Sequence, residues 1–235
     1  MTTPLGILIL DTRFPRIAGD VGNGETFSFP VLYERLEGIG PQQAVREAPG
    51  RADLIDTLVQ ASERLVRRGA KGISTSCGFL ALLQRELAQR CSVPVATSSL
   101  LQVPMVERLL PAGRKVGIIT AEAKSLTRAH LEAAGVDPQT PVAGMPEGGS
   151  FAHTFLGNNP DLDFRGVQEE LVAVGRQFVA AHRDLGAIVL ECTNLPPYAR
   201  ALHEAVGLPI YDMRGFLHWF QAGLQPQRPI GGIAI

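Results

Sequence analysis

Short apolar runs alternate along this chain with longer stretches in which apolar residues recur every three or four positions. The runs at 6–10 (GILIL) and 115–120 (KVGIIT) are continuous, which is typical of parallel strands covered by helices on both faces. The stretches at 53–68 and 167–178 have helical spacing. This alternation predicts βαβ units, and therefore an α/β fold with parallel sheets and right-handed crossovers.

The same pattern places the other elements. Two segments, 72–79 (GISTSCGF) and 187–195 (AIVLECTNL), look like a buried strand that turns into a helix at a cysteine. Two long loops rich in Gly, Pro and charge, 11–30 and 144–163, follow the strands expected at 6–10 and 140–143, and loops of this length are often functional. The tail at 225–235 shows no clear element. Further strands are expected at 30–36, 93–96, 140–143 and 208–211, and further helices after Cys77, at 100–110, at 126–134, after Cys192 and at 214–223.

The two cysteine turns belong to an internal repeat. Cys192 follows Cys77 by 115 positions, and Pro209 follows Pro94 by the same interval. We therefore predict two pseudo-symmetric lobes, each a doubly wound, flavodoxin-like sheet flanked by helices, with the active site in the cleft between them. Lobe one would comprise 1–100 and 213–235, and lobe two 101–212, because the last helix is expected to pack back on lobe one.

Cys77 and Cys192 are the central candidates for chemistry. In parallel α/β sheets ligands bind beyond the carboxyl ends of the strands, which is where both cysteines are expected. Each would also start a helix, where the free N–H groups favour negative charge and lower a thiol pKa from about 8.5 toward neutrality. Two such groups facing one small acid could remove a proton from one face of a carbon and return one to the other.

The motifs GILILD, STSCG and ECTN resemble the aspartate/glutamate racemase superfamily, and the resemblance covers nearly the whole chain. It implies that Cys77 and Cys192 are the two acid–base residues, that Asp11 lies beside a catalytic cysteine and that Thr193 helps to hold the substrate. Members with both cysteines are racemases, whereas those that keep one perform decarboxylation or cis–trans isomerisation. The resemblance implies no cofactor.

Three departures from the glutamate racemase pattern concern the substrate. Gly78 and Phe79 replace an amide and a hydroxyl residue after the first cysteine, and Asn194 replaces a histidine after the second. The glycine-rich turn after the first strand is replaced by 12–23 (TRFPRIAGDVGN). We therefore do not assign glutamate or aspartate as the substrate.

Other polar residues near the strand ends have both a functional and a structural interpretation. Arg13 and Arg16 could hold a carboxylate with two hydrogen bonds, but loop arginines are more often solvated. Asn23 and Thr120 are counted with Asp11, Gly78, Thr193 and Asn194 as substrate-binding candidates. Roles for Glu122 and His153 stay open, whereas Glu191 is expected to point to the opposite face of the sheet and to be structural, like Cys91.

Composition narrows the class of protein. The chain has 235 residues, 45% of them hydrophobic, and a formal net charge of −1 without blocks of like charge, which argues against nucleic acid or an anionic membrane as a partner. The three cysteines contain no CxxC pair, and no His or Cys spacing suggests a metal site. The first apolar run is too short to span a bilayer and has no basic residue before it. We expect a cytoplasmic homo-oligomer.

Three functions are compatible with these observations. The first is a cofactor-independent racemase or epimerase of an amino acid or a derivative, with two cysteine bases. The second is a decarboxylase or cis–trans isomerase of a small dicarboxylic acid, in which one cysteine acts and the other assists. The third is a two-lobed protein that binds a small carboxylate or amino-acid-like molecule without converting it.

Overall fold

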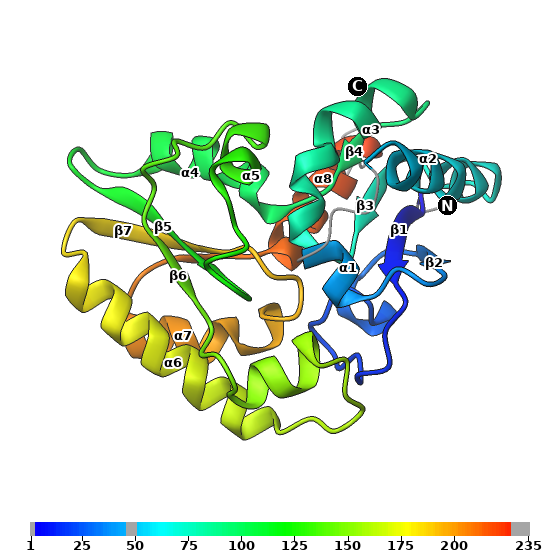
Figure 1. The fold of residues 1–235 in the computed structure, drawn as a ribbon. Helices are drawn as coiled ribbons and strands as arrows, with labels where there is room; N and C mark the ends of the chain where they lie inside the picture. The colour runs from blue at the N-terminus through cyan, green and yellow to red at the C-terminus, as the bar shows by residue number, and fades with distance from the viewer. Residues whose placement is uncertain (1–2, 46–50, 227–235) are drawn as a thin grey trace, which may run out of the picture.

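A computed structural model describes residues 3–45 and 51–226. It contains two four-stranded parallel sheets, with strand orders β2-β1-β3-β4 and β6-β5-β7-β8 (Figure 1). The predicted α/β fold with two similar lobes is confirmed. The strands are β1 (Leu5–Leu10), β2 (Val31–Leu36), β3 (Ile73–Thr75), β4 (Val95–Ala96), β5 (Lys115–Thr120), β6 (Val142–Gly144), β7 (Leu185–Leu190) and β8 (Ile210–Tyr211).

The repeat extends to the register of the strands. Ile73 of β3 pairs with Val95 of β4, and Ile188 of β7 pairs with Ile210 of β8, with each partner again 115 positions later. The two cysteine turns therefore stand at equivalent places in two equivalent sheets, because each follows the third strand of its lobe at the same register.

The helices fall where apolar spacing predicts them, except for the short helix at 41–45, which was not expected, and short 3₁₀ turns lie at several ends. Gly69 ends α2 in the left-handed conformation (φ +105°), as expected of a C-terminal glycine. Pro104 lies in the first turn of α4, where its missing N–H costs nothing. The α-helices are α1 (Pro41–Val45), α2 (Arg51–Arg67), α3 (Gln84–Arg90), α4 (Val103–Leu109), α5 (Arg128–Ala133), α6 (Phe164–Ala181), α7 (Ala199–Val206) and α8 (Met213–Leu224).

The segment after Cys77 differs from the expected α-helix. It begins as the 3₁₀ helix η2 (Gly78–Leu83) and only then continues as α3. Leu83, between the two, adopts neither an α nor an extended conformation. The apolar sequence GFLALL packs five of its six residues into the core, and this burial holds the tighter turn.

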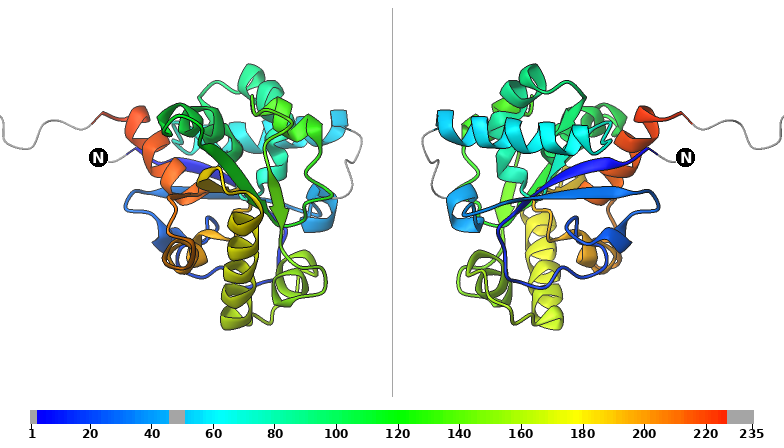
Figure 2. Two further views of the ribbon diagram at one scale, coloured as in Figure 1. Left: turned by 90° about the vertical axis from the view of Figure 1, so that its left-hand side faces the viewer. Right: turned by 90° about the vertical axis from the view of Figure 1, so that its right-hand side faces the viewer.

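Alternate residues of β1 enter two cores. Leu8 and Leu10 contribute to the larger cluster, which includes α2, whereas Leu5 and Ile7 face a smaller cluster that includes Phe216 and Leu217 of α8. This period of two is what a strand covered on both faces requires. The last helix thus packs on the first sheet, and Figure 2 shows the start of β1 beside α8.

In the second lobe, α6 and α7 lie side by side on one face of the sheet, and α4 and α5 lie on the other (Figure 1). The two long loops follow β1 and β6. The first contains the 3₁₀ helix η1 (Gly24–Thr26), and the second contains the single π-helical turn η4 (Ala152–Leu156). The tail at 227–235, for which no element was expected, lies outside the described residues.

Candidate active site

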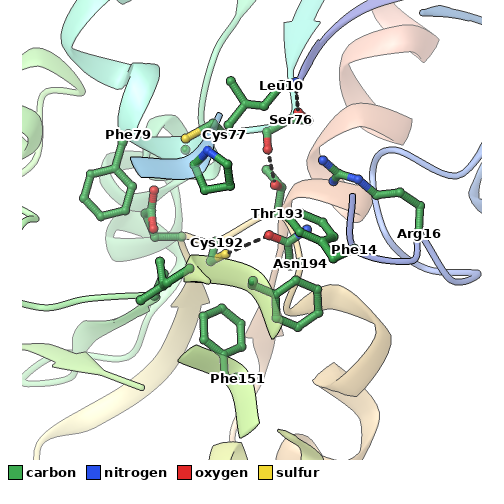
Figure 3. Close-up of a pocket in the computed structure, with 16 residues that line it drawn as sticks. Leu10, Phe14, Arg16, Ser76, Cys77, Phe79, Phe151, Cys192, Thr193 and Asn194 are labelled. Atoms are coloured by element: carbon green, nitrogen blue, oxygen red, sulfur yellow. Dashed lines mark hydrogen bonds between the residues drawn. The ribbon is translucent and has the colours of Figure 1, made fainter. Parts of the chain in front are cut away.

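A pocket of about 410 Å³, counted with its open mouth, lies where the carboxyl ends of the two sheets meet. Both predicted cysteines line it, together with residues of both long loops (Figure 3). Its walls are mainly apolar and include four phenylalanines. The lining residues are Leu10, Phe14, Arg16, Pro41, Ser76, Cys77, Gly78, Phe79, Ala121, Phe151, Phe155, Leu156, Glu191, Cys192, Thr193 and Asn194.

Hydrogen bonds between the lobes fix the two cysteine turns against each other. The Thr193 hydroxyl donates to the carbonyl of Ser76 at 2.6 Å, so the residue after one cysteine holds the residue before the other. The Ser99 hydroxyl donates to the carbonyl of Leu190 at 2.6 Å, one residue before Glu191. All these groups are buried, which makes the bonds costly to break.

A chain of polar contacts leads from Cys192 to the first long loop. The Cys192 thiol donates to the Asn194 side-chain oxygen at 3.6 Å, and the Asn194 amide donates to Asp20 at 2.7 Å. Asp20 is 1% exposed and also accepts a bond from Arg16 at 2.9 Å. The Arg16 guanidinium stands 4.5 Å from the centre of the Phe14 ring. The loop that replaces a glycine-rich turn thus carries a buried ion pair to the edge of the pocket.

Both cysteines are neutral thiols in the free pocket. Burial raises the pKa of the Cys77 thiol to about 12, and the nearby Glu191 charge adds to this effect. Burial and Glu191 likewise raise the pKa of the Cys192 thiol well above its ordinary value. The expectation that helix N-termini lower both pKa values is wrong. Backbone N–H groups of Phe79, Leu80 and Asn194 do favour the thiolates, but loss of solvent outweighs them.

Glu191 lines the pocket, although its place in the sequence suggested the opposite face. Strand β7 ends at Leu190, so the alternation of side chains no longer applies one residue later. The Glu191 side chain is fully buried; its Oε2 accepts a bond from the Thr120 hydroxyl at 2.7 Å, and its Oε1 has no partner. Burial raises the pKa of this carboxyl to about 7, which the Thr120 bond only partly offsets.

Gly78 explains where this carboxyl fits. A Cβ on Gly78 would lie 2.1 Å from the Glu191 Oε1 and 2.5 Å from the Glu191 carbonyl oxygen. Contacts below 3.0 Å are not tolerated, so only glycine allows Glu191 its position. The missing side chain at 78, expected to remove a substrate contact, instead makes room for a carboxyl group. Phe79 both lines the pocket and packs edge-on against His130, with ring centres 5.3 Å apart.

The predicted site residues divide into two groups. Cys77, Cys192, Gly78, Thr193 and Asn194 line the pocket, and so does Arg16, whose role had stayed open. The remaining candidates lie outside the lining of this pocket. They are Asp11, Arg13, Asn23, Thr120, Glu122 and His153.

Each residue outside has a structural partner. Asp11 forms an ion pair with Arg35 and accepts the Gly38 N–H at 3.0 Å, which together with Arg35 holds its pKa below the ordinary value. The backbone N–H of Arg13 donates to the side chain of Asn158.

Others outside the pocket hold loops or neighbouring side chains. The Asn23 side chain caps η1 and donates to the carbonyl of Arg16, so it shapes the first loop. Thr120 acts on the pocket only through Glu191. Glu122 accepts a bond from Ser125, and His153 contacts Asn159.

Within residues 3–45 and 51–226, no group of three His, Cys, Asp or Glu side chains is arranged to hold a metal ion. The helices of the same residues include none that is long and apolar enough to cross a bilayer. Cys91 lies half-buried, away from the pocket.

Similar proteins are known from both sequence and structure, although no protein-family model matches the chain. A dimethylsulfoniopropionate lyase of Durusdinium sp. clade D is 31% identical over 246 residues, which cover 97% of this chain and 80% of the relative. Dimethylsulfoniopropionate lyase 3 of Emiliania huxleyi is 31% identical over 219 residues. The aligned region covers 88% of this chain and 56% of that protein.

Solved structures with the same fold are more distant in sequence. A mutant of arylmalonate decarboxylase in its sulfate-associated form superposes with a TM-score of 0.65 at 18% identity over 97% of both chains. An aspartate racemase homologue from Pyrococcus horikoshii superposes with a TM-score of 0.58 at 14% identity, over 95% of this chain and 99% of that one. The fold of the resembled superfamily is therefore confirmed. The chain belongs to the family of the Durusdinium dimethylsulfoniopropionate lyase, and it shares the fold of arylmalonate decarboxylase and of the aspartate racemase homologue.

Proposed function

We propose that the protein is a cofactor-independent lyase that eliminates a leaving group from the carbon β to the carboxylate of a small acid, with dimethylsulfoniopropionate as the first substrate to test. The observation that supports this proposal is the pair of cysteines in one pocket of a chain whose relatives are named lyases. The names favour a lyase over the amino-acid racemase that two cysteines suggested. They also favour an enzyme over a protein that only binds.

The proposed reaction removes one proton and one leaving group. A cysteine thiolate takes the proton from the carbon next to the carboxylate, and the C–H electron pair forms the new carbon–carbon double bond. The carbon–sulfur bond breaks, and its electron pair leaves with sulfur as neutral dimethyl sulfide. The other product is acrylate, and the cysteine ends as a thiol that must release its proton before the next turnover.

The raised thiol pKa values are compatible with this step because the substrate is itself charged. A sulfonium cation bound beside Cys77 or Cys192 stabilises the thiolate and lowers the thiol pKa, the reverse of the effect of Glu191. The thiolate then forms only when the substrate is present. Such a site leaves the free enzyme in an unreactive thiol form.

Assay of the purified protein with dimethylsulfoniopropionate tests the proposal. Dimethyl sulfide is measured by gas chromatography and acrylate by liquid chromatography, in equal amounts. The Cys77→Ala and Cys192→Ala variants should each lose at least about 100-fold in kcat/KM, the lower range for removing a general base. Cys91→Ala is the matched control and should keep full activity. No product from wild type, or full activity of both site variants, contradicts the proposal.

Decarboxylation of a small dicarboxylic acid is the second candidate. The neutral state of both thiols favours it, because a thiol can donate its proton to the carbanion left when the carbon–carbon bond breaks and CO₂ departs. The buried Glu191 carboxyl disfavours it, because a second carboxylate would be repelled. Release of CO₂ from arylmalonates without any alkene product would favour this candidate. Stereoinversion of amino acids or hydantoins with deuterium uptake would favour the racemase.

A further inference from the structure

Two residues that line the pocket each have one buried polar atom without a hydrogen-bond partner, and these two atoms have opposite character. One is the Oε1 acceptor of Glu191, and the other is the Nε–H donor of Arg16. Their residues belong to different lobes and line the same pocket. A buried polar group without a partner costs free energy, so a ligand that satisfies both atoms gains what the free protein lacks.

The charges of these two residues are not equivalent. Arg16 is paired with Asp20, which is itself buried, so that end of the pocket is electrically balanced. In the described part of the chain no ion pair includes Glu191, and Thr120, its hydrogen-bond partner, is uncharged. An ionised Glu191 therefore leaves one uncompensated negative charge between the two cysteines.

The absence of a side chain at Gly78 leaves room for the Glu191 carboxyl, and packing alone does not explain why a carboxyl is present there. Glu191 reaches its position only because residue 78 has no side chain. A smaller apolar residue at 191 would avoid both the loss of solvent and the unpartnered oxygen. Retaining a carboxyl there makes physical sense if a ligand supplies the missing positive charge.

The aromatic rings of the pocket favour the same kind of ligand. Phe79, Phe151 and Phe155 line it, and the faces of aromatic rings attract onium cations that cannot donate hydrogen bonds. Figure 3 shows Arg16 on the side of the pocket away from Phe79, and its guanidinium lies over the Phe14 ring. The pocket thus combines aromatic walls with a carboxyl group from one lobe and a guanidinium donor from the other.

We propose that Glu191 is the recognition site for an onium cation and that Arg16 Nε–H binds the carboxylate of the same molecule, so that the pocket selects zwitterionic acids over simple acids. This inference rests on the proposed function and assigns the two ends of its substrate. In that arrangement the sulfonium group lies beside Glu191, and the carbons between the two charges lie beside the cysteines.

Two inert molecules of equal shape test the assignment without turnover. The first is β-alanine betaine, which carries a trimethylammonium group, and the second is its isostere with a neutral tert-butyl group in that place and the same carboxylate. Calorimetry with wild type should show the betaine binding about tenfold tighter or more, since tenfold in Kd corresponds to only about 1.4 kcal/mol. Glu191→Gln should reduce the ratio to near one while the affinity for the isostere stays unchanged or improves.

Control variants separate charge from shape. Glu122→Gln removes another buried carboxyl that does not line the pocket, and it should keep the wild-type ratio. Glu191→Asp keeps the charge and should retain a clear preference for the betaine. This result would show that a substitution at position 191 does not by itself abolish the preference. Arg16→Met should weaken both molecules alike.

The outcomes also separate this inference from the proposed reaction. Equal affinities in wild type, or an unchanged ratio in Glu191→Gln, would overturn the assignment even if dimethyl sulfide is released. A strong preference for the betaine that depends on Glu191, with no release of dimethyl sulfide, would uphold the recognition site and reject the lyase.

Discussion

The carboxyl group of Glu191 occupies the place where a side chain on Gly78 would begin, since a Cβ there would lie 2.1 Å from Oε1. Gly78→Ala should therefore displace Glu191 and destabilise the protein by about 1–3 kcal/mol, the usual cost of overpacking. It should also lower the betaine preference, as Glu191→Gln does. Chemical denaturation and calorimetry measure the two effects. In the double variant Gly78→Ala/Glu191→Gln the cost should stay, because Gln has the same size, whereas Gly78→Ala/Glu191→Ala should recover part of it.

Glu191 should make the stability of the free protein depend on pH. Its pKa is raised from 4.5 to about 7 by burial, so the folded chain holds this proton over a range in which the unfolded chain releases it. Stability from this group is complete below about pH 4.5 and is lost as pH rises through 7. The loss amounts to roughly 3 kcal/mol by linkage. Urea unfolding at several pH values should show that Glu191→Gln lacks this decline.

The groups that face Glu191 do not change their charge over this pH range, so the predicted loss of stability with rising pH comes from Glu191 itself. Thr120 does not titrate, and the thiols of Cys77 and Cys192 stay neutral across this range because their own pKa values are raised. Only the carboxyl then changes charge between pH 4.5 and 7 in that part of the pocket. An identical decline in wild type and Glu191→Gln would contradict the assignment.

Alkylation rates should reveal the neutral state of the site cysteines. In a Cys91→Ser background, iodoacetamide should label Cys77 and Cys192 slowly at pH 7, and the rate should rise nearly tenfold per pH unit, because only the thiolate reacts. Mass spectrometry of the labelled peptides measures both sites separately. Rapid labelling at pH 6 would mean that the helix starts, rather than burial, control these thiols.

Asp20 should be essential for the position of both Arg16 and Asn194. Asp20→Asn leaves the Arg16 guanidinium without its anion, and removing one partner of a buried ion pair costs roughly 3–5 kcal/mol. Thermal unfolding measures this loss. Asp11→Asn is the matched control, since Asp11 pairs with Arg35 at the surface and its loss should cost much less stability than the loss of Asp20. Similar losses in both variants would argue against a buried network.

The hydrogen bond from the Thr193 hydroxyl to the Ser76 carbonyl should stabilise the contact between the two lobes at the site. Thr193→Val keeps the shape and removes the 2.6 Å bond to the Ser76 carbonyl, which should cost about 1 kcal/mol or more because that oxygen is left unpaired. Thr193→Ser keeps the hydroxyl and should recover most of the loss. If the valine variant is as stable as wild type, the bond contributes nothing to closure of the pocket.

The sequence was most informative where its pattern repeats. The apolar runs, the helical spacing and the interval of 115 positions predicted both sheets and brought Cys77 and Cys192 to one pocket. These features depend on local pattern and on the rule that ligands bind at the carboxyl ends of parallel strands. Gly78, Thr193 and Asn194 were found through the resemblance to the racemase superfamily, because they occupy the first or second position after a cysteine in its motifs.

Residues that depend on loop paths or on strand ends could not be placed in this way. Asp11 directly follows β1 but turns to Arg35 of the neighbouring strand instead of the pocket. Arg16 reaches the pocket only because the first loop folds around Asp20. Glu191 was assigned to the wrong face because the strand ends one residue earlier than the alternation assumed. The low pKa expected of both thiols failed because burial cannot be read from spacing.

The repeat has one more consequence, for the direction in which a ligand lies. Counted back by 115 positions, Cys192, Thr193 and Glu191 correspond to Cys77, Gly78 and Ser76. Two nearly equivalent half-sites would accept a small molecule in either of two opposite orientations with similar energy. Ser76 is uncharged and engaged with the N–H of Leu10, whereas Glu191 carries the free acceptor. This difference in charge favours one of the two orientations, so that each cysteine would face a fixed side of the bound molecule.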